Sequence, residues 1–487
     1  MTHVVNSLQF QITCPDEEMA FNLRHNFGQT VQQDIAQIID EVCSETVGED
    51  ESIKIDRIEL DMGSFSRHGF GTNFKTVFAQ KLRNELAKKL SDINPVVRQA
   101  SRRLSNTETL LYFLSNGTLP WFADEATVNI DEIFKDAAAN QPGVLTVFFQ
   151  QKRSAEKIWQ RISWQLNDAS KALVISLSPQ LNTARETMVN WINQIAEKIS
   201  SAAQHANDLA GSGLQISAQA ENDLVSAGLQ RALLDINNAV LKNAVAIFTS
   251  NAGEQVLKKM FAAHIATVFS GNVALENKIR LEFSILTGSE QEPAEVKTAQ
   301  IQSPADAPTQ QKVPGYAFED TAEKYSVKHA GLVLLAPFLK PFFTELNLLD
   351  GNDWKTPESA FKAVHLLKFL ADGRTSAPEY TLVFEKILCG LPVEMPVPLD
   401  IVLEDNETAE AASLLQAVLT HWKILQSTNI DGLRESFIKR DGILTKKETG
   451  WQLQVERKTL DVLLDRIPWG YSTISLGWNR YLIFVEW

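Results

Sequence analysis

The segment of residues 451–487 constrains the fold most, because it combines strand periodicity with a concentration of tryptophan. Polar and apolar residues alternate along residues 452–456, which is the period of a half-buried β-strand. Residues 474–476 and 482–485 predict two more short strands, around a turn near residues 478–480. We therefore expect the chain to end in a short β-hairpin. Chain ends fray unless they are held, so this end is expected to be docked or recognised.

Residues 317–487 form a predicted C-terminal domain that is mainly helical until its last strands. Thr356 as N-cap, Pro357 at the first helical position and Gly373 beyond the end delimit one helix. The other expected helices span residues 378–390, 405–425 and 429–440. These capping residues agree with the apolar periodicity, and together they predict a helical domain that carries a small β-element.

Residues 142–288 are predicted to be a helical middle region, poor in proline and glycine. The expected breaks are Ser178-Pro179 and Gly211-Ser-Gly213. One continuous helix over residues 143–286 would span roughly 215 Å at 1.5 Å per residue, which is long enough for a measuring segment. The heptad regularity of a long coiled coil is missing, however, so a set of packed helices is the favoured interpretation.

Residues 1–141 are predicted to be an N-terminal α+β unit. Alternating residues indicate strands over 4–13 and 53–62, and residues 16–44 read as helical with an interruption near Gly28. Apolar residues recur at helical spacing over 74–90, which predicts a strongly amphipathic helix. That stripe could bind a partner, but burial against the neighbouring strands is favoured because most such stripes are core. The predicted fold class is therefore mainly α with small α+β parts, in several domains.

Residues 289–316 are predicted to be a proline-rich linker between the middle region and the C-terminal domain. Pro293, Pro304, Pro308 and Pro314 stand among Ala, Gln, Thr and Glu, with almost no apolar residue. Such a segment cannot bury enough surface to offset the entropy of ordering it. The composition predicts a flexible and partly extended connection.

Composition excludes several classes of partner and compartment. The 487 residues are 44% hydrophobic and 22% charged, as in ordinary globular proteins, and the net charge is −14. A negative chain is not expected to bind nucleic acid or an anionic membrane surface. Three scattered cysteines fit a reducing compartment, and the N-terminus shows no secretory signal. The longest apolar stretch, residues 330–343, is too short to span a bilayer, so no stable membrane insertion is expected.

No catalytic, cofactor-binding or metal-binding site is predicted. The eight histidines form no H-E-x-x-H pair, and the cysteines lack zinc-ligand spacing. His365, Cys389 and His421 are therefore read as ordinary core or surface residues. Gly211-Ser-Gly213 lacks both the lysine and the strand context of a phosphate loop, and no Rossmann fingerprint or nucleophile elbow is present. We expect neither a metal nor a cofactor.

The carboxyl end is the candidate docking surface. Its aromatic side chains can serve as core or as interface, and its clustered charges fit dedicated Arg to carboxylate docking pairs as well as ordinary solvated ion pairs. Leu119-Pro-Trp121 echoes Ile467-Pro-Trp469, and in both the proline places the indole after a bend. The candidate partner-docking residues are Trp121, Arg434, Arg440, Glu456, Arg457, Pro468, Trp469, Trp478, Phe484 and Trp487.

Several blocks along the chain point to one family. They are residues 55–63, 113–121, 328–339, 361–367, 378–380, 386–392, 421–422, 433–442 and the terminal segment. In order and spacing these blocks resemble the tape measure proteins of contractile injection systems, the phage-tail-like particles that push a rigid tube through a target envelope. The resemblance covers both ends and misses the middle. One departure is Leu476-Gly-Trp478, where the family pattern has proline before the tryptophan.

The resemblance implies a structural and assembly protein, not an enzyme. Members occupy the inner tube during assembly, set its length and contact baseplate or hub proteins, and a homo-oligomer is compatible with that role. The resemblance implies that the chain is in the bacterial cytoplasm during assembly and then within the assembled particle. A second hypothesis is an assembly chaperone or adaptor that binds hub or cargo proteins of the same particle without measuring anything.

The linker composition makes a prediction about proteolysis. Limited digestion of the purified chain should cut first within residues 289–316, because exposed backbone without buried side chains is the preferred protease substrate. Mass spectrometry of the first two products should map both new ends to this segment. A first cut in any other segment would contradict the predicted boundary.

Overall fold

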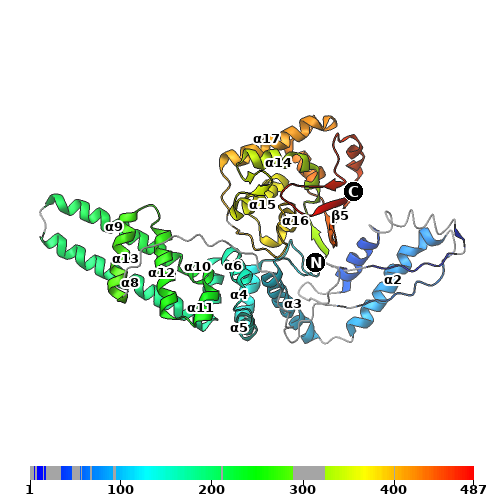
Figure 1. Ribbon diagram of the computed structural model, residues 1–487. Coiled ribbons are helices and arrows are strands. Elements are labelled where there is room, and N and C mark those ends of the chain that lie inside the picture. Colours follow the sequence, from blue (N-terminus) through cyan, green and yellow to red (C-terminus); the bar gives the residue numbers. More distant parts are fainter. Residues whose placement is uncertain are drawn as a thin grey trace. The chain divides into compact units, whose positions relative to one another are not determined.

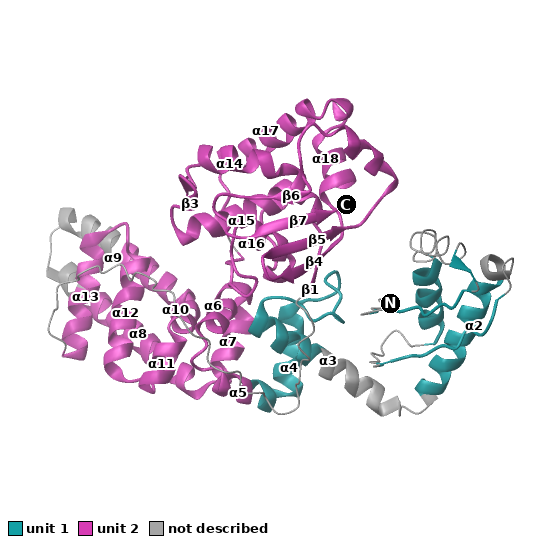
Figure 2. Cartoon of the chain, turned by 45° about the vertical axis from the view of Figure 1, so that its right-hand side comes forward, with its two compact units in different colours: residues 1–145 teal, residues 146–487 magenta. Residues whose placement is uncertain are grey.

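A computed structural model describes residues 5, 8–14, 16, 17, 34–46, 55, 57–65, 69–91, 95–209, 212–288, 324–399 and 401–487. The chain divides into two compact units, Met1–Leu145 and Thr146–Trp487 (Figure 2). The predicted linker, residues 289–316, lies outside the described residues, and the predicted domain boundaries remain predictions. The expected fold class, mainly α with small β parts, is confirmed.

The first unit is built around an amphipathic helix. Its described helices are residues 34–46, α2 (Gly69–Ser91), α3 (Pro95–Asn116) and α4 (Ile130–Asn140), and α5 (Pro142–Gln151) crosses the boundary to the second unit. On α2, Phe74, Phe78, Leu82 and Leu86 are buried and share a core with Ile35 and Val42. The apolar stripe predicted over residues 74–90 is therefore core, as expected, and is not an open partner-binding face.

The two strands expected in this unit are not formed by the described residues. Residues 8–14 and 57–65 carry neither helix nor strand structure. Inward alternation of the apolar side chains is seen in residues 57–65, where Ile58 and Leu60 pack against the α2 core. In residues 8–14 Phe10 packs there as well, but Leu8 and Ile12 are exposed. The alternation therefore indicated one-sided burial correctly for residues 57–65 only. A strand also needs a hydrogen-bonded neighbour, and period-two patterning carries no information about one.

The helical middle consists of several packed helices of 7 to 31 residues, which confirms the favoured interpretation. The helices are α6 (Glu156–Gln165), α7 (Asp168–Ser176), α8 (Pro179–Leu209), α9 (Ser212–Leu234), α10 (Ile236–Lys242), α11 (Ala244–Ser250), α12 (Glu254–Val268) and α13 (Val273–Thr287). Both predicted breaks are helix boundaries, because α8 begins at Pro179 and α9 at Ser212. The 31-residue α8 is about 46 Å long at 1.5 Å per residue and lies beside α9 (Figure 1).

Aromatic contacts hold these helices together. Trp191 on α8 meets Phe261 of α12 and Phe283 of α13 edge to face, at ring-centroid distances of 5.5 and 5.2 Å. Phe261 and Phe283 lie 4.3 Å apart. Aromatic pairs at such distances add to the free energy gained by burying their area. The middle region is therefore a folded bundle with its own apolar core.

The C-terminal part surrounds a second core with helices and strands. Its α-helices are α14 (Ala336–Glu345), α15 (Pro357–Asp372), α16 (Val383–Leu388), α17 (Asp405–His421) and α18 (Ile430–Leu433), and its strands are β1 (Lys324–Val327), β2 (Leu349–Asp350), β3 (Asp353–Trp354), β4 (Gly442–Lys447), β5 (Gly450–Val455), β6 (Thr473–Ile474) and β7 (Leu482–Glu486). The label η marks the 3-10 helices η1 (Ala330–Leu335), η2 (Glu379–Thr381), η3 (Lys423–Leu425) and η5 (Thr459–Arg466) and the π-helix η4 (Arg434–Ile438). The predicted caps are confirmed, since Thr356 accepts from the Ser359 backbone N–H and Gly373 has φ of 76°.

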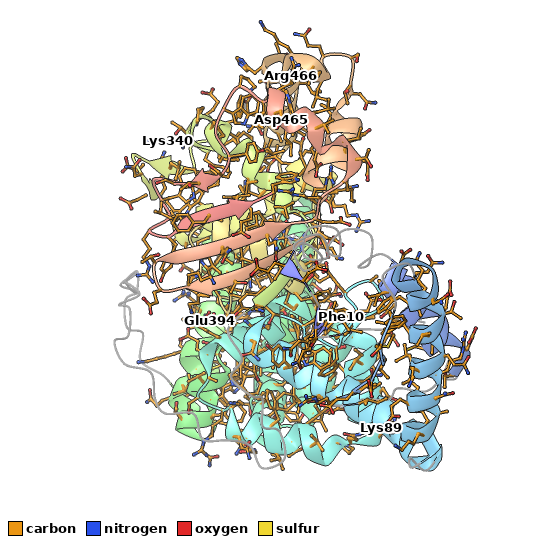
Figure 3. All side chains as sticks on the ribbon, turned by 90° about the vertical axis from the view of Figure 1, so that its right-hand side faces the viewer. Phe10, Lys89, Lys340, Glu394, Asp465 and Arg466 are labelled. Carbon is orange, nitrogen blue, oxygen red and sulfur yellow. The ribbon has the colours of Figure 1, made fainter. Side chains whose placement is uncertain are left out.

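The terminal strands belong to a larger sheet than the sequence predicted. The expected hairpin exists, because β6 pairs antiparallel with β7. It forms one edge of a five-stranded sheet in the order β1-β4-β5-β7-β6, in which β5 and β7 run parallel (Figure 3). Strands β1 and β4 were not expected. β1 is only four residues long, and β4 follows η4 after three residues, so neither stands out as a separate periodic segment.

The sheet packs on a close backbone crossing between η1 and η4. The backbone N–H of Ala330 donates to the Arg440 carbonyl at 2.9 Å. A Cβ atom placed on Gly331 would lie 1.8 Å from the Phe437 carbonyl oxygen, so only glycine fits at this crossing. One face of the sheet, with Leu444, Leu453 and Val485, is buried in the same core.

This crossing gives a stability prediction. Gly331→Ala should lower the free energy of unfolding of the C-terminal part by at least about 2 kcal/mol, because the added methyl meets backbone that cannot move aside. Gly470→Ala is the matched control, since among the described residues no atom beyond its two chain neighbours lies within 4 Å of the added methyl. Denaturant unfolding followed by tryptophan fluorescence measures both. Equal stability of the two variants would contradict the close crossing.

Candidate docking surface at the carboxyl-terminal sheet

Strand β7 divides its side chains between the core and the outer face of the sheet. Ile483 and Val485 point inward and are buried, whereas Leu482, Phe484 and Glu486 are exposed. Successive side chains of a strand point to opposite faces, so this alternation follows from the strand geometry. The outer face is therefore the part of this segment that another protein can contact.

The strand register extends this outer face across the sheet. Phe484 pairs with Gln452 on β5 and with Thr473 on β6, and Gln454 pairs with Ile443 on β4. Paired residues lie on the same face of a sheet. Ile443 is 50% exposed and Phe484 is 40% exposed. We call the set Ile443, Thr445, Gln452, Gln454, Thr473, Phe484 and Glu486 the outer sheet face.

Three candidate tryptophans are anchored in the domain by their indole N–H groups. Trp469 donates to the Leu334 carbonyl at 3.0 Å, Trp478 to the Leu388 carbonyl at 2.9 Å and Trp487 to Asp461 Oδ2 at 3.0 Å. A buried indole usually has such a partner. All three side chains are half-buried and pack against the core. Their contacts are those of structural anchors rather than of free interface residues.

Trp478 attaches the loop between β6 and β7 to the helices. Its ring lies 5.4 Å from both Phe343 and Trp354. Beside it, the Asn479 side chain donates to the Ile387 carbonyl at 2.7 Å. Gly390, at φ of 72°, lies so close to the Trp478 carbonyl that a Cβ atom would be 2.9 Å away. The loop is thereby fixed to the end of α16.

Arg434 and Arg440 also serve the interior. Arg434 donates to the carbonyls of Phe369 and Leu370, at 3.0 and 3.1 Å, and so closes the last turn of α15. Arg440 is fully buried and donates to Asp461 Oδ1 at 2.7 Å, and its Nη1 atom has no hydrogen-bond partner among the described residues. These contacts stabilise the domain.

Glu456, Arg457 and Pro468 are exposed at the margin of the terminal segment. Glu456 forms an ion pair of 3.2 Å with Lys458, and Arg457 donates to the Trp487 backbone oxygen at 2.7 Å. Exposed pairs of this kind contribute between roughly 0 and 1 kcal/mol. Their docking role remains a prediction. Nearby on η5, Asp465 and Arg466 are also exposed (Figure 3).

Trp121 lies in the other compact unit. Its side chain is 48% exposed and meets Phe122 edge to face at 5.8 Å. The resemblance between the two Pro-Trp motifs therefore does not extend to their environments, because the indole of Trp469 is hydrogen bonded and packs on Phe338 at 5.1 Å. The C-terminal candidates therefore share one compact unit, and Trp121 belongs to the other.

A buried charged cluster was missed by the sequence analysis. Arg161 on α6 pairs with Glu379, which also binds Lys386, and the side chains of all three residues are fully buried. Burial lowers the pKa of Lys386 and outweighs the Glu379 carboxylate, which raises it; the positive charge of Arg161 adds a smaller lowering. Arg161 and Glu379 are separated by 218 positions, and no local sequence pattern links them. Close by, burial raises the pKa of the Cys389 thiol well above its ordinary value.

A second buried cluster joins the start of η1 to α15 and α16. His329 Nδ1 lies 2.6 Å from Glu385 Oε1, and Lys368 Nζ lies 2.9 Å from Asp372 Oδ2. Among the described residues, no group of three or more His, Cys, Asp and Glu side chains is arranged to hold a metal ion. Within the same residues, no helix has both the length and the apolar character needed to cross a bilayer.

Comparison with known proteins identifies the family. The family model described as "Contractile injection system tape measure protein" matches residues 2–487. No curated protein and no solved structure matches the chain. The match includes the helical middle, which the sequence blocks alone did not cover. A match over this range shows that the chain belongs to the contractile injection system tape measure protein family.

Proposed function

We propose that this chain sets the length of the inner tube of a contractile injection particle and contacts its baseplate or hub proteins. The family match over residues 2–487 carries the proposal. In this role the chain is a structural component without enzymatic activity. It is present in the bacterial cytoplasm during assembly and then within the particle, and its partners are tube, baseplate or hub proteins.

The outer sheet face is the proposed contact surface for a baseplate or hub protein. It presents Ile443 and Phe484 to solvent between polar side chains. An exposed aromatic surrounded by polar groups is the usual composition of an interface hot spot. Glu456, Arg457 and Pro468 stand at the margin of this segment and are proposed as rim contacts.

An adaptor that binds hub or cargo proteins without measuring is the second candidate. The packing of the helical middle favours it, because residues 146–288 form several helices packed around an aromatic core and not one continuous helix. An adaptor needs only its docking surface. A length-setting protein also needs a segment whose size changes the tube.

Shortening the α8 and α9 pair tests the length-setting role. Deleting residues 203–209 and 212–218 removes about two turns from each helix. Tubes should become about 10 Å shorter if the folded pair is the measure, or about 21 Å shorter if the chain is read as extended helix. Averaged cryo-electron images of purified particles give the length. Replacing the same residues by a helix-forming sequence of equal length is the matched control.

Each result of that experiment has a distinct meaning. Tubes of unchanged and uniform length would exclude this pair as the measure and favour the adaptor. Tubes that shorten with the deletion but keep their length in the replacement control would support measurement by size alone. Variable lengths in the control would show that the local sequence, rather than its size, is needed.

The outer sheet face predicts a separation between stability and assembly. Phe484→Gln should change the thermal midpoint of the chain by only a few degrees, because the side chain is already 40% exposed, yet it should reduce particle yield at least tenfold. Trp478→Ala should instead destabilise the fold by about 3 to 5 kcal/mol. Calorimetry and particle counts measure the two effects. Val462→Gln is the matched control, because Val462 is exposed on η5, outside the outer sheet face. A full particle yield from Phe484→Gln would exclude this face as the docking surface.

A further inference from the structure

Helix α6 of the middle region is seated on the C-terminal part through one buried arginine. Arg161 donates from Nε to Glu379 Oε2 at 2.8 Å and from Nη2 to Glu379 Oε1 at 3.0 Å. The same Nη2 donates to the Glu394 carbonyl at 2.7 Å. Both side chains are fully buried. This is the bidentate geometry that makes Arg to carboxylate pairs strong and selective.

Gln165, one helical turn further along α6, makes a reciprocal pair of hydrogen bonds. Its Nε2 donates to the Val397 carbonyl at 2.7 Å, and its Oε1 accepts from the Glu379 backbone N–H at 2.9 Å. Trp164 adds an edge-to-face contact with Phe361 at 5.8 Å. The C-terminal part thus offers a carboxylate, two carbonyls and one N–H, arranged to match an Arg and a Gln at i and i+4 on a helix.

Lys386 gives the cluster an unusual charge balance. Its Nζ donates to Glu379 Oε1 at 2.6 Å and to the Val393 carbonyl at 2.9 Å. With α6 in place, two cations share one buried carboxylate. Without α6, Lys386 and Glu379 form a neutral pair within the C-terminal part, and Arg161 returns to water. Departure of α6 therefore leaves no uncompensated buried charge, which is the main cost of breaking a buried ion pair.

We propose that the Glu379 carboxylate with the Glu394 and Val397 carbonyls forms a receptor for α6 of the same chain, and that the helical middle can leave this receptor and return to it. The receptor selects its helix by polar matching. An apolar contact of the same area would hold the two parts without such selectivity. The inference does not depend on the length-setting role, because it concerns only contacts within the chain.

The test uses the full chain with a specific protease site inserted within residues 289–316. Cleavage leaves α6 and the C-terminal part on separate polypeptides. We expect the two pieces to elute together in size-exclusion chromatography, to separate on dilution and to reassociate on concentration. Dilution with one piece fluorescently labelled gives the dissociation constant.

Substitutions at the α6 contact should change the dissociation constant: two should weaken the association and one should strengthen it. Arg161→Met should weaken association about a hundredfold, because it removes two charge-assisted hydrogen bonds and leaves the Glu394 carbonyl without its donor. Gln165→Ala should weaken it about tenfold. Lys386→Met should tighten it about tenfold, because Glu379 is then unpaired whenever α6 is absent.

Lys157→Ala is the matched control on the same helix. Lys157 forms an exposed ion pair of 3.3 Å with Glu394, at the margin of the contact. Its removal should change the dissociation constant less than about fivefold. Circular dichroism melts show whether each variant is folded. If Arg161→Met does not fold, Gln165→Ala supplies the test instead, because it leaves every charge in place.

Three outcomes would overturn the proposal. Pieces that part at once after cleavage would show that α6 is not held. Pieces that stay together on dilution, in the wild type and in Arg161→Met alike, would show that other contacts join them permanently. Uncleaved chain that dimerises at high concentration, and loses this in Arg161→Met, would show that the receptor takes α6 from a second copy.

Discussion

The parallel pairing of β5 with β7 is the constraint on which the C-terminal part depends. Parallel neighbours cannot be joined by a tight turn, so the chain must cross over between them. The crossover, residues 456–481, contains η5, β6, Trp469 and Trp478. Each indole is hydrogen bonded to the domain beneath the crossover. The aromatic residues that made this segment conspicuous are therefore the attachments of the crossover, and Phe484 is left to face outward.

The sequence predicted the elements that depend on residues close together in the chain, and it missed those that depend on distant residues. The α15 caps, both helix breaks and the β6–β7 hairpin depend on residues close in sequence, and all were predicted. Pairing of β1 with β4 joins Val327 to Gly442 across helices, and no local pattern records it. The receptor for α6 is the extreme case, because Arg161 and Glu379 become partners only when the helical middle is seated.

The candidate site, too, could be predicted from the sequence only in part. Sequence reasoning placed aromatic and charged residues near the carboxyl end but could not divide them between core and surface. The division came from strand register, which turns Phe484 outward and Ile483 inward, and from single hydrogen bonds such as that of Trp487 to Asp461. Arg434 and Arg440 looked like surface charges, yet they satisfy interior carbonyls and a carboxylate.

The aromatic contacts of the helical middle and the polar contact of α6 differ in the free energy needed to separate them. Separating Trp191, Phe261 and Phe283 exposes aromatic surface to water, which costs free energy in proportion to the area exposed. Separating Arg161 from Glu379 exchanges protein hydrogen bonds for water and leaves Lys386 to neutralise the carboxylate. The α6 contact should therefore open before the bundle unfolds.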